Sequence, residues 1–148
     1  MKTIRRAAAT LLLLLAANGA SAMDFVSVSD ASAILYDAPS TKSNKLFVIS
    51  RFMPLEQVVA LDAWIKVRDN VGTLGWIARS AVSNARYVMV TTDMAELRQT
   101  PAEASAVLLR LKSNVALELI ERTGDGWVKV RHSTGVEGYL RTADVWGI

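Results

Sequence analysis

"WIKVRDNVGTLGWI", at Trp64–Ile77, returns later in the chain as "WVKVRHSTGVEGYL", at Trp127–Leu140. The two stretches align at an offset of 63 residues and share a tryptophan, a Lys-Val-Arg run and two glycines. Upstream the offset is 62, where Pro39 meets Pro101, so one residue has been gained near Arg122–Gly126. Loops tolerate such changes in length. The sequence therefore predicts an internal duplication with a repeat of about sixty residues.

Each repeat has the pattern of short strands separated by turns. Segments such as DFVSVS, at Asp24–Ser29, alternate apolar and polar residues with period two, which is typical of a half-buried strand. Five or six short strands suit a small closed barrel, because closure removes exposed sheet edges. The expected strands are Phe25–Val28, Ala33–Tyr36, Leu46–Ile49, Glu56–Leu61, Trp64–Arg68 and Gly75–Ala78 in the first repeat, and Tyr87–Thr91, Ala95–Arg98, Val107–Leu111, Ala116–Glu121, Trp127–Arg131 and Gly138–Arg141 in the second.

The first residues have the pattern of a secretory leader. Three basic residues precede an apolar run from Ala7 to Ala17, and small residues follow at Ala20 and Ala22. The run is too short to span a membrane, which takes about 20 apolar residues. We expect cleavage after Ala22 and a periplasmic or secreted product. The expected parts are a signal peptide at 1–22, a first barrel at 23–84 and a second barrel at 85–148.

The chain contains no cysteine. Lipoproteins need a cysteine at the cleavage site, so a lipid anchor is not expected. Disulfides are excluded as well, although the expected compartment is oxidising. Stability is therefore expected to come from packing alone.

The net charge of the mature chain argues against nucleic acid as a partner. The full chain has 17 Lys and Arg against 14 Asp and Glu, and three of the basic residues lie in the leader. The mature chain then carries 14 of each and has no net charge. Nucleic-acid binding usually needs clustered Lys and Arg, and no such cluster is present. We also expect no stable membrane insertion after cleavage, and the oligomeric state stays open.

The two barrels are expected to touch. The linker SNAR, at Ser83–Arg86, lacks the Gly-rich or Pro-rich composition of a long spacer. A unit of about sixty residues buries only a modest core, so some apolar surface is expected to be shared. Trp146 has no counterpart in the first repeat and is expected to pack down the last segment.

The residues from Leu35 to Ile77 resemble the bacterial SH3 (SH3b-type) domain family. In that family a turn with proline leads to a variable loop, a Trp-x-Lys-Val-Arg strand, and a strand with glycine before Trp or Tyr. The second repeat matches through AELRQTPAEASAVLLRL, GDGWVKVRHSTG and EGYL. The resemblance covers Met23–Ile148 and implies two tandem small SH3-like β-barrels, an all-β fold. Relatives attached to cell-wall hydrolases are implied to bind peptidoglycan peptides, but no hydrolase is attached here.

One departure from the family pattern separates the repeats. The first repeat has Leu35-Tyr36-Asp37 where family members commonly show an Asn/Val-Arg run, whereas the second keeps Leu97-Arg98. Either the two copies differ in ligand, or only one of them binds.

The sequence offers little for catalysis. Nucleophilic catalysis needs a base oriented beside the nucleophile. The only histidine, His132, takes the place of Asp69 in the first repeat and is expected to be an exposed turn residue. One histidine without cysteine leaves no His/Cys metal cluster. We expect that the protein is not an enzyme and that it has no cofactor and no metal site.

Strand parity predicts which side chains face outward. In WIKVR, Ile65 and Val67 point one way, and Trp64, Lys66 and Arg68 point the other. If the aliphatic residues fill the barrel, aromatic and basic residues gather on its outer side. Aromatic rings with a polar tip suit grooves that accept extended peptides. The predicted ligand-binding residues are Trp64, Arg68, Trp76, Trp127, Arg131 and Tyr139.

Other roles for these residues stay open. Trp64 and Trp127 could instead cover the open end of the core, and the outward aromatic residues could equally lie between the barrels. Arg68 and Arg131 could bind a carboxylate, be solvated, or pair with Asp62 or Asp125. The first hypothesis for function is an exported, non-enzymatic protein that binds cell-wall (peptidoglycan) peptides in aromatic-lined grooves. The alternative is an envelope adaptor that uses the same surfaces against a folded protein.

Overall fold

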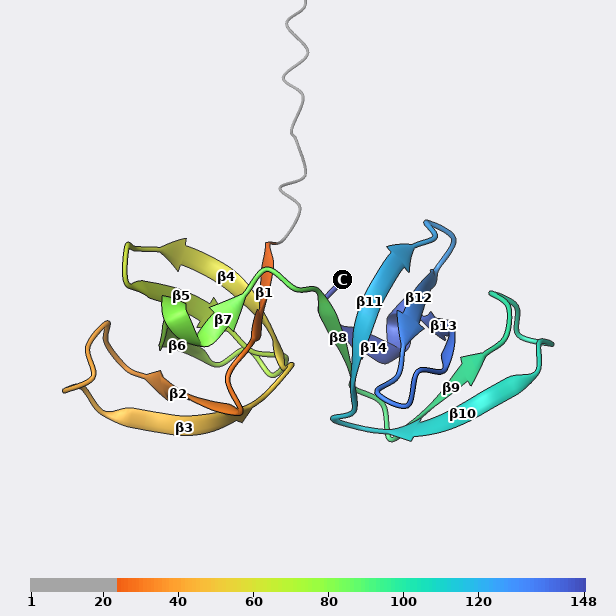
Figure 1. Cartoon of the computed structure of the whole chain (residues 1–148), viewed down its shortest axis with the longest axis horizontal. Helices are drawn as coiled ribbons and strands as arrows, with labels where there is room; N and C mark the ends of the chain where they lie inside the picture. Colours follow the sequence, from red (N-terminus) through yellow and green to blue (C-terminus); the bar gives the residue numbers. More distant parts are fainter. Residues whose placement is uncertain (1–23) are drawn as a thin grey trace, which may run out of the picture.

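The structure, a computed structural model, describes residues 24–148, so the predicted leader and its cleavage site at Ala22 lie outside the described residues. It is all-β and consists of two tandem barrels that lie side by side (Figure 1). The first contains β1 (Phe25–Val28), β2 (Ser32–Tyr36), β3 (Lys45–Ser50), β4 (Pro54–Ala60), β5 (Trp64–Arg68), β6 (Leu74–Ala78), the 3-10 turn η1 (Arg79–Ala81) and β7 (Val82–Ser83). The second contains β8 (Tyr87–Val90), β9 (Met94–Arg98), β10 (Val107–Lys112), β11 (Ala116–Arg122), β12 (Trp127–Arg131), β13 (Glu137–Arg141), η2 (Thr142–Asp144) and β14 (Val145–Trp146).

Each barrel is one curled, antiparallel, seven-stranded sheet, and the strand order is the same in both. The first runs β3-β2-β6-β5-β4-β1-β7 and the second β10-β9-β13-β12-β11-β8-β14. Among residues 24–148 no ladder joins β3 to β7 or β10 to β14, so each barrel curls without a continuous ring of strand pairing. The short last strand of each repeat pairs with β1 or β8 instead. The shared topology confirms the tandem duplication.

The interior of each barrel is aliphatic, as parity predicts. Side chains at alternate positions of β5, β6, β12 and β13 are at most 1% exposed: Ile65, Val67, Ile77, Val128, Val130 and Leu140. Leu35 and Leu55 complete the first core, and Leu97 and Leu117 the second. Burying one such side chain contributes about 1.5–3 kcal/mol. The cores leave no room for a ligand inside a barrel, so any recognition has to use the outer surface.

The turn between β5 and β6, and its counterpart between β12 and β13, explains the first of the two glycines that the repeats share. Gly72 and Gly135 have φ of 92° and 90°, in the region that side chains with a Cβ rarely adopt. Their N–H groups donate to the carbonyls of Asp69 and His132 at 3.1 and 2.9 Å. His132 is thus a turn residue, as expected, although it is half-buried rather than exposed.

Aromatic residues join the two barrels, which confirms that they touch. The rings of Phe52 and Tyr87 stack with centroids 4.5 Å apart, and Phe25 meets Trp146 edge-to-face at 5.2 Å. Figure 1 shows β1 and β8 on the facing sides of the two barrels. Trp146 therefore anchors the last strand, as expected, and also contacts the first barrel. We call this set of four aromatic residues the seam.

Backbone conformation at the seam is unusual at two places. Phe52 has φ of 68°, which is rare for a bulky residue, whereas Asn114 occupies the equivalent place in the second barrel with φ of 67°. Gly147 has φ of 106°, and a Cβ there would lie 2.7 Å from the Tyr87 carbonyl oxygen and 2.8 Å from Pro54 Cβ. The strained Phe52 and the close approach at Gly147 both occur where one barrel meets the other.

Candidate functional site

The predicted aromatic residues lie on the outer faces of the barrels and are half-buried. Trp64 faces Ala78 across the β5–β6 ladder, and Lys66 faces Trp76. The Lys66 ammonium lies 6.0 Å from the centroid of the Trp76 ring, within cation–π range. Parity therefore gives the correct side for these residues. It does not show which of them border a hollow in the surface.

The second barrel has a concave pocket beside Trp127. Its volume is about 280 Å³, at the low end for ligand sites. The walls come from β9, the loop after it, β12, β13 and η2. The lining residues are Met94, Glu96, Arg98, Glu103, Trp127, Arg141 and Asp144. We call this hollow the charged pocket.

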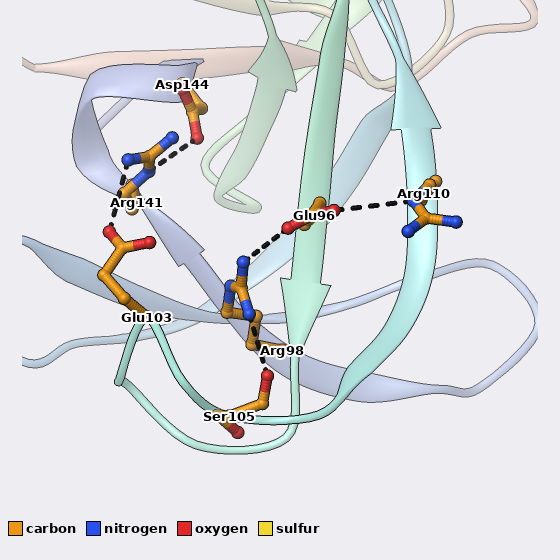
Figure 2. A network of polar contacts seen from close by, with 7 residues as sticks. All are labelled: Glu96, Arg98, Glu103, Ser105, Arg110, Arg141 and Asp144. Carbon is orange, nitrogen blue, oxygen red and sulfur yellow. Dashed lines mark hydrogen bonds and ion pairs between the residues drawn. The ribbon is translucent and has the colours of Figure 1, made fainter.

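Ion pairs hold the walls of the charged pocket together (Figure 2). Arg98 pairs with Glu96 on the same strand and donates from Nη1 to the Ser105 carbonyl oxygen at 2.8 Å. Arg141 contacts Glu103 and Asp144 at 3.2 Å each. The Glu103 pair joins the loop after β9 to the end of β13.

The charge state of Arg141 follows from these contacts. The hydrogen bond to Asp144 raises the pKa of the Arg141 guanidinium, and the charges of Asp144 and Glu103 add to the effect. The side chain is about half exposed, so water screens the pairs and their contribution to stability is small. These contacts position the groups more than they stabilise the fold.

The first barrel has a pocket at the equivalent place, beside Trp64. Its volume is about 270 Å³. Tyr36 is buried and packs edge-to-face on Trp64, with ring centroids 5.5 Å apart. The lining residues are Asp30, Ser32, Ala33, Ile34, Tyr36, Thr41, Trp64, Ala78, Ser80 and Ala81. Asp30 is the one charged residue among those that line it, and we call this hollow the neutral pocket.

Seven lining positions correspond between the two pockets under the repeat offsets of 62 and 63 residues. Trp64 corresponds to Trp127, and Tyr36 to Arg98. The other equivalent pairs are Ser32 with Met94, Ile34 with Glu96, Thr41 with Glu103, Ala78 with Arg141, and Ala81 with Asp144. A hollow of similar volume therefore recurs at the same place in both repeats.

The predicted site residues therefore divide into two groups. Trp64 and Trp127 line the equivalent pockets, whereas Trp76 and Tyr139 line neither. The residues around Trp64 and those around Trp127 each belong to a single barrel, so the interface role left open for these two tryptophans is wrong. The aromatic residues of the seam take that role instead.

Both arginines pair with glutamates, and not with Asp62 or Asp125, which was one of the alternatives left open. Arg68 pairs with Glu56 at 3.2 Å, and Arg131 pairs with Glu118 and Glu137 at 2.8 and 2.7 Å. Each partner lies directly opposite its arginine in an antiparallel ladder. Facing side chains in such ladders are near neighbours, which explains the choice.

Protonation at this ladder follows from the same contacts. The hydrogen bond to Glu137 raises the pKa of Arg131, and the one to Glu118 adds to it. The hydrogen bond from Arg131 lowers the pKa of the Glu137 carboxyl, although partial desolvation opposes the shift. Both groups are charged at neutral pH and satisfy one another. Neither Arg68 nor Arg131 reaches the two equivalent pockets.

Sequence reasoning misses most of the pocket lining. Five residues carry the charge of the second pocket but are not among the predicted site residues: Glu96, Arg98, Glu103, Arg141 and Asp144. The one signal that could have found them is the contrast between Tyr36 and Arg98 at the same place of the repeat. Among residues 24–148, no three His, Asp or Glu side chains gather as metal ligands do. That part of the chain also contains no helix long and apolar enough to cross a membrane.

The profile of the bacterial SH3 domain family matches residues 29–84 and again residues 91–147. The chain belongs to this family. The two matched regions coincide with the two barrels, so each barrel is a bacterial SH3 domain. Among curated proteins, none matches the chain.

Solved structures with similar folds include two proteins from Trichomonas vaginalis and one from Bacillus cereus. NlpC2 and NlpC1 from Trichomonas vaginalis are 11% and 12% identical over 86% and 93% of this chain, with TM-scores of 0.40. An NlpC/P60 family protein from Bacillus cereus ATCC 10987 is 18% identical over 82% of this chain, with a TM-score of 0.38. This chain spans about half the length of those three, at 49%, 51% and 55%.

Proposed function

We propose that this protein is an exported, non-enzymatic binding protein of the cell envelope that holds cell-wall peptides in the pockets beside Trp64 and Trp127. The observation that carries the proposal is the recurrence of one pocket, built on one tryptophan, at the same place of both SH3 domains. Duplication of a site serves recognition directly, because two linked sites on one ligand bind with higher avidity than either alone.

The shape and chemistry of the pockets support peptide recognition. A half-buried indole beside polar groups offers apolar contact area together with hydrogen-bonding partners. Grooves with aromatic walls are a recurring way of binding extended peptides. Membership of the bacterial SH3 family supports a ligand of the cell wall or envelope. The aliphatic barrel interiors support recognition at the outer surface.

A non-enzymatic role is part of the proposal. The Nδ1 atom of His132 lies 2.8 Å from Thr134 Oγ1, within its own turn. That contact fits a residue that shapes the β12–β13 turn. Binding at equilibrium then accounts for function without a chemical step. The leader pattern at residues 1–22 supports export, with the mature protein in the periplasm or secreted.

Retention on purified peptidoglycan sacculi tests the proposal. We expect the mature chain, residues 23–148, to co-sediment with sacculi and to be released by soluble cell-wall peptides. Trp64→Ala and Trp127→Ala should each weaken retention, and the double variant should lose it, because truncating an interface tryptophan typically costs about tenfold or more. Trp76→Ala and Tyr139→Ala are the matched controls, since these aromatics are equally outward but line neither pocket.

The result that rejects the proposal is equally specific. Absence of the parent protein from the sacculus pellet, or equal retention of all four variants, would show that the pockets are not the binding sites. Circular dichroism of each variant separates loss of binding from loss of fold.

A second candidate function has one observation in its favour. A hollow of about 280 Å³ between the barrels has mainly apolar walls, from Phe47 and Val48 of the first barrel to Met89 of the second, with Arg51 and Asn114 also in its lining. The Val48 side chain is 67% exposed. Such a surface fits a folded envelope protein, as an adaptor would require. Crosslinking from position 48 in cells distinguishes this function: one dominant protein partner supports the adaptor, and crosslinks to cell-wall material or none favour the first proposal.

A further inference from the structure

The two equivalent pockets have different chemistry. Of the seven corresponding positions, five carry a charged side chain in the second barrel and none does in the first. The exchange of Tyr36 for Arg98 removes the aromatic partner of the tryptophan and places a guanidinium there. If both copies of the site still bound the same ligand group, we would expect their lining residues to have stayed alike. The two pockets therefore differ in the ligand groups that they can hold.

The carboxylates of the charged pocket keep free acceptor capacity. Asp144 receives Arg141 on Oδ2, and Glu103 receives Arg141 on Oε1. Among the described residues, the second oxygen of each carboxylate has no side-chain donor. Glu96 differs, because Arg98 and Arg110 occupy both of its oxygens. Asp144 and Glu103 are thus the lining carboxylates that each have one oxygen without a side-chain donor, free to accept from an ammonium.

The guanidinium groups keep free donors as well. An arginine carries five N–H donors. Arg98 uses donors on both terminal nitrogens, for Glu96 and for the Ser105 carbonyl. Arg141 uses donors on Nε and Nη1. Each arginine therefore has N–H groups left for a carboxylate that enters the pocket, and a guanidinium can bind a carboxylate with two parallel bonds.

We propose that the charged pocket of the second barrel binds a zwitterionic group, as in a short peptide with a free amino and a free carboxyl end. The ammonium is held by Glu103 and Asp144, the carboxylate by Arg98 and Arg141, and the body of the peptide lies against Trp127. The neutral pocket of the first barrel takes an uncharged part of a ligand. This inference rests on the proposed function and specifies the ligand group at each pocket.

Charge balance selects a zwitterion over a single charge. Three acidic and two basic side chains line the pocket, and Arg110, which lies outside the lining, pairs with Glu96. Three positive charges thus balance three negative ones, so a lone cation or anion would leave one sign in excess. A zwitterion adds one charge of each sign and keeps the balance. The pairs that it shares are partly exposed and contribute little to stability, so redistributing their hydrogen bonds costs little. The volume of about 280 Å³ suits a group the size of a dipeptide.

Residue-specific NMR with end-blocked peptides tests the inference. The probes are dialanine, its N-acetyl form, its C-terminal amide and the doubly blocked form, added to the ¹⁵N-labelled mature chain. The indole N–H signals of Trp127 and Trp64 report the two pockets separately. For Trp127 we expect saturable binding of dialanine that weakens about tenfold on blocking either end, as loss of one charge-assisted hydrogen bond predicts. For Trp64 we expect no discrimination among the four probes.

Two variant proteins make the test specific. Asp144→Asn should weaken the binding of dialanine and leave the binding of the doubly blocked form unchanged, because the substitution removes a charge but little volume. A triple variant of the first barrel, Tyr36→Arg with Ala78→Arg and Ala81→Asp, copies the charged lining. We expect it to give the Trp64 signal the end-group preference of Trp127.

The outcomes that overturn the inference are distinct from those that reject the proposed function. Equal affinity of Trp127 for free and blocked dialanine, or no response to dialanine up to its solubility, overturns the zwitterion site. Trp127-dependent retention on sacculi would leave the proposed function standing in that case. Absence of retention on sacculi rejects the proposed function whichever peptides bind.

Discussion

Gly138→Ala is the substitution that most directly connects the packing of the second barrel with its pocket. A Cβ at Gly138 would lie 2.7 Å from the carbonyl oxygen of Arg98 and 2.8 Å from Leu97 Cγ. Ordinary contacts between carbon atoms are about 3.5–4.0 Å. Leu97 is fully buried, and Arg98 faces Tyr139 at the β9–β13 ladder. Strand β9 therefore has to move away from β13.

The expected loss of stability follows from these contacts. Overpacking a close-packed core costs about 1–3 kcal/mol. Separating β9 from β13 adds about 1 kcal/mol for a weakened backbone hydrogen bond. The sum, about 2–4 kcal/mol, is a large part of the free energy of unfolding of a small domain. With a urea slope of about 1–3 kcal/mol per molar, the unfolding midpoint should fall by about 1 M or more.

Urea unfolding followed by tryptophan fluorescence measures this loss. Gly75→Ala is the matched variant in the first barrel, where the new Cβ would overlap Leu35 Cγ and Cδ2. Both variants should unfold at lower urea than the parent. Only Gly138→Ala should also weaken ligand binding at Trp127, because it moves Arg98. A Gly138→Ala midpoint that corresponds to a loss of less than about 0.5 kcal/mol in the free energy of unfolding would refute the close packing, because surface substitutions have effects of that size.

Three further predictions concern the seam, the pH dependence and the leader. Trp146→Ala should cost about 2 kcal/mol, part of it the edge-to-face contact with Phe25, and should let the barrels tumble separately; unchanged ¹⁵N relaxation rates would contradict this. Glu137→Gln should lower the urea midpoint at pH 7, because the hydrogen bond from Arg131 lowers the pKa of Glu137 in the folded state. That contribution exists above the ordinary carboxyl range and is lost as pH falls through the lowered pKa, so the two midpoints should converge in acid; a gap independent of pH would contradict it. Mass spectrometry of the exported protein should show Met23 as its first residue, and a retained leader would reject cleavage after Ala22.

Alternation predicts the strands well because a strand with one buried face has to alternate. Trp64–Arg68 and Trp127–Arg131 have the bounds expected from the sequence. The same reasoning misses Val82–Ser83 and Val145–Trp146. A strand of two residues is too short to show alternation, and each of these strands depends on pairing with β1 or β8. Their position comes from tertiary structure.

The pockets depend on information that alternation lacks. Parity places Trp64 on the outer face, but Tyr36 reaches it only because β2 lies beside β6, and these strands are far apart in the sequence. The same holds for Arg98 and Arg141 in the second barrel. Likewise, the partner of Arg68 is Glu56 because the two face each other in a ladder, whereas nearness in sequence favoured Asp62. The sequence predicts which face of the sheet a side chain lies on. Predicting which site the side chain belongs to also requires the order of the strands in the sheet.

The most direct test of the account is backbone-amide NMR mapping of the mature chain with soluble peptide fragments released from purified cell walls. The account predicts saturable shift changes that cluster around Trp64 and Trp127 and leave the hollow between the barrels at Val48 unchanged. Shift changes confined to the hollow between the barrels at Val48, or none at all, would contradict it.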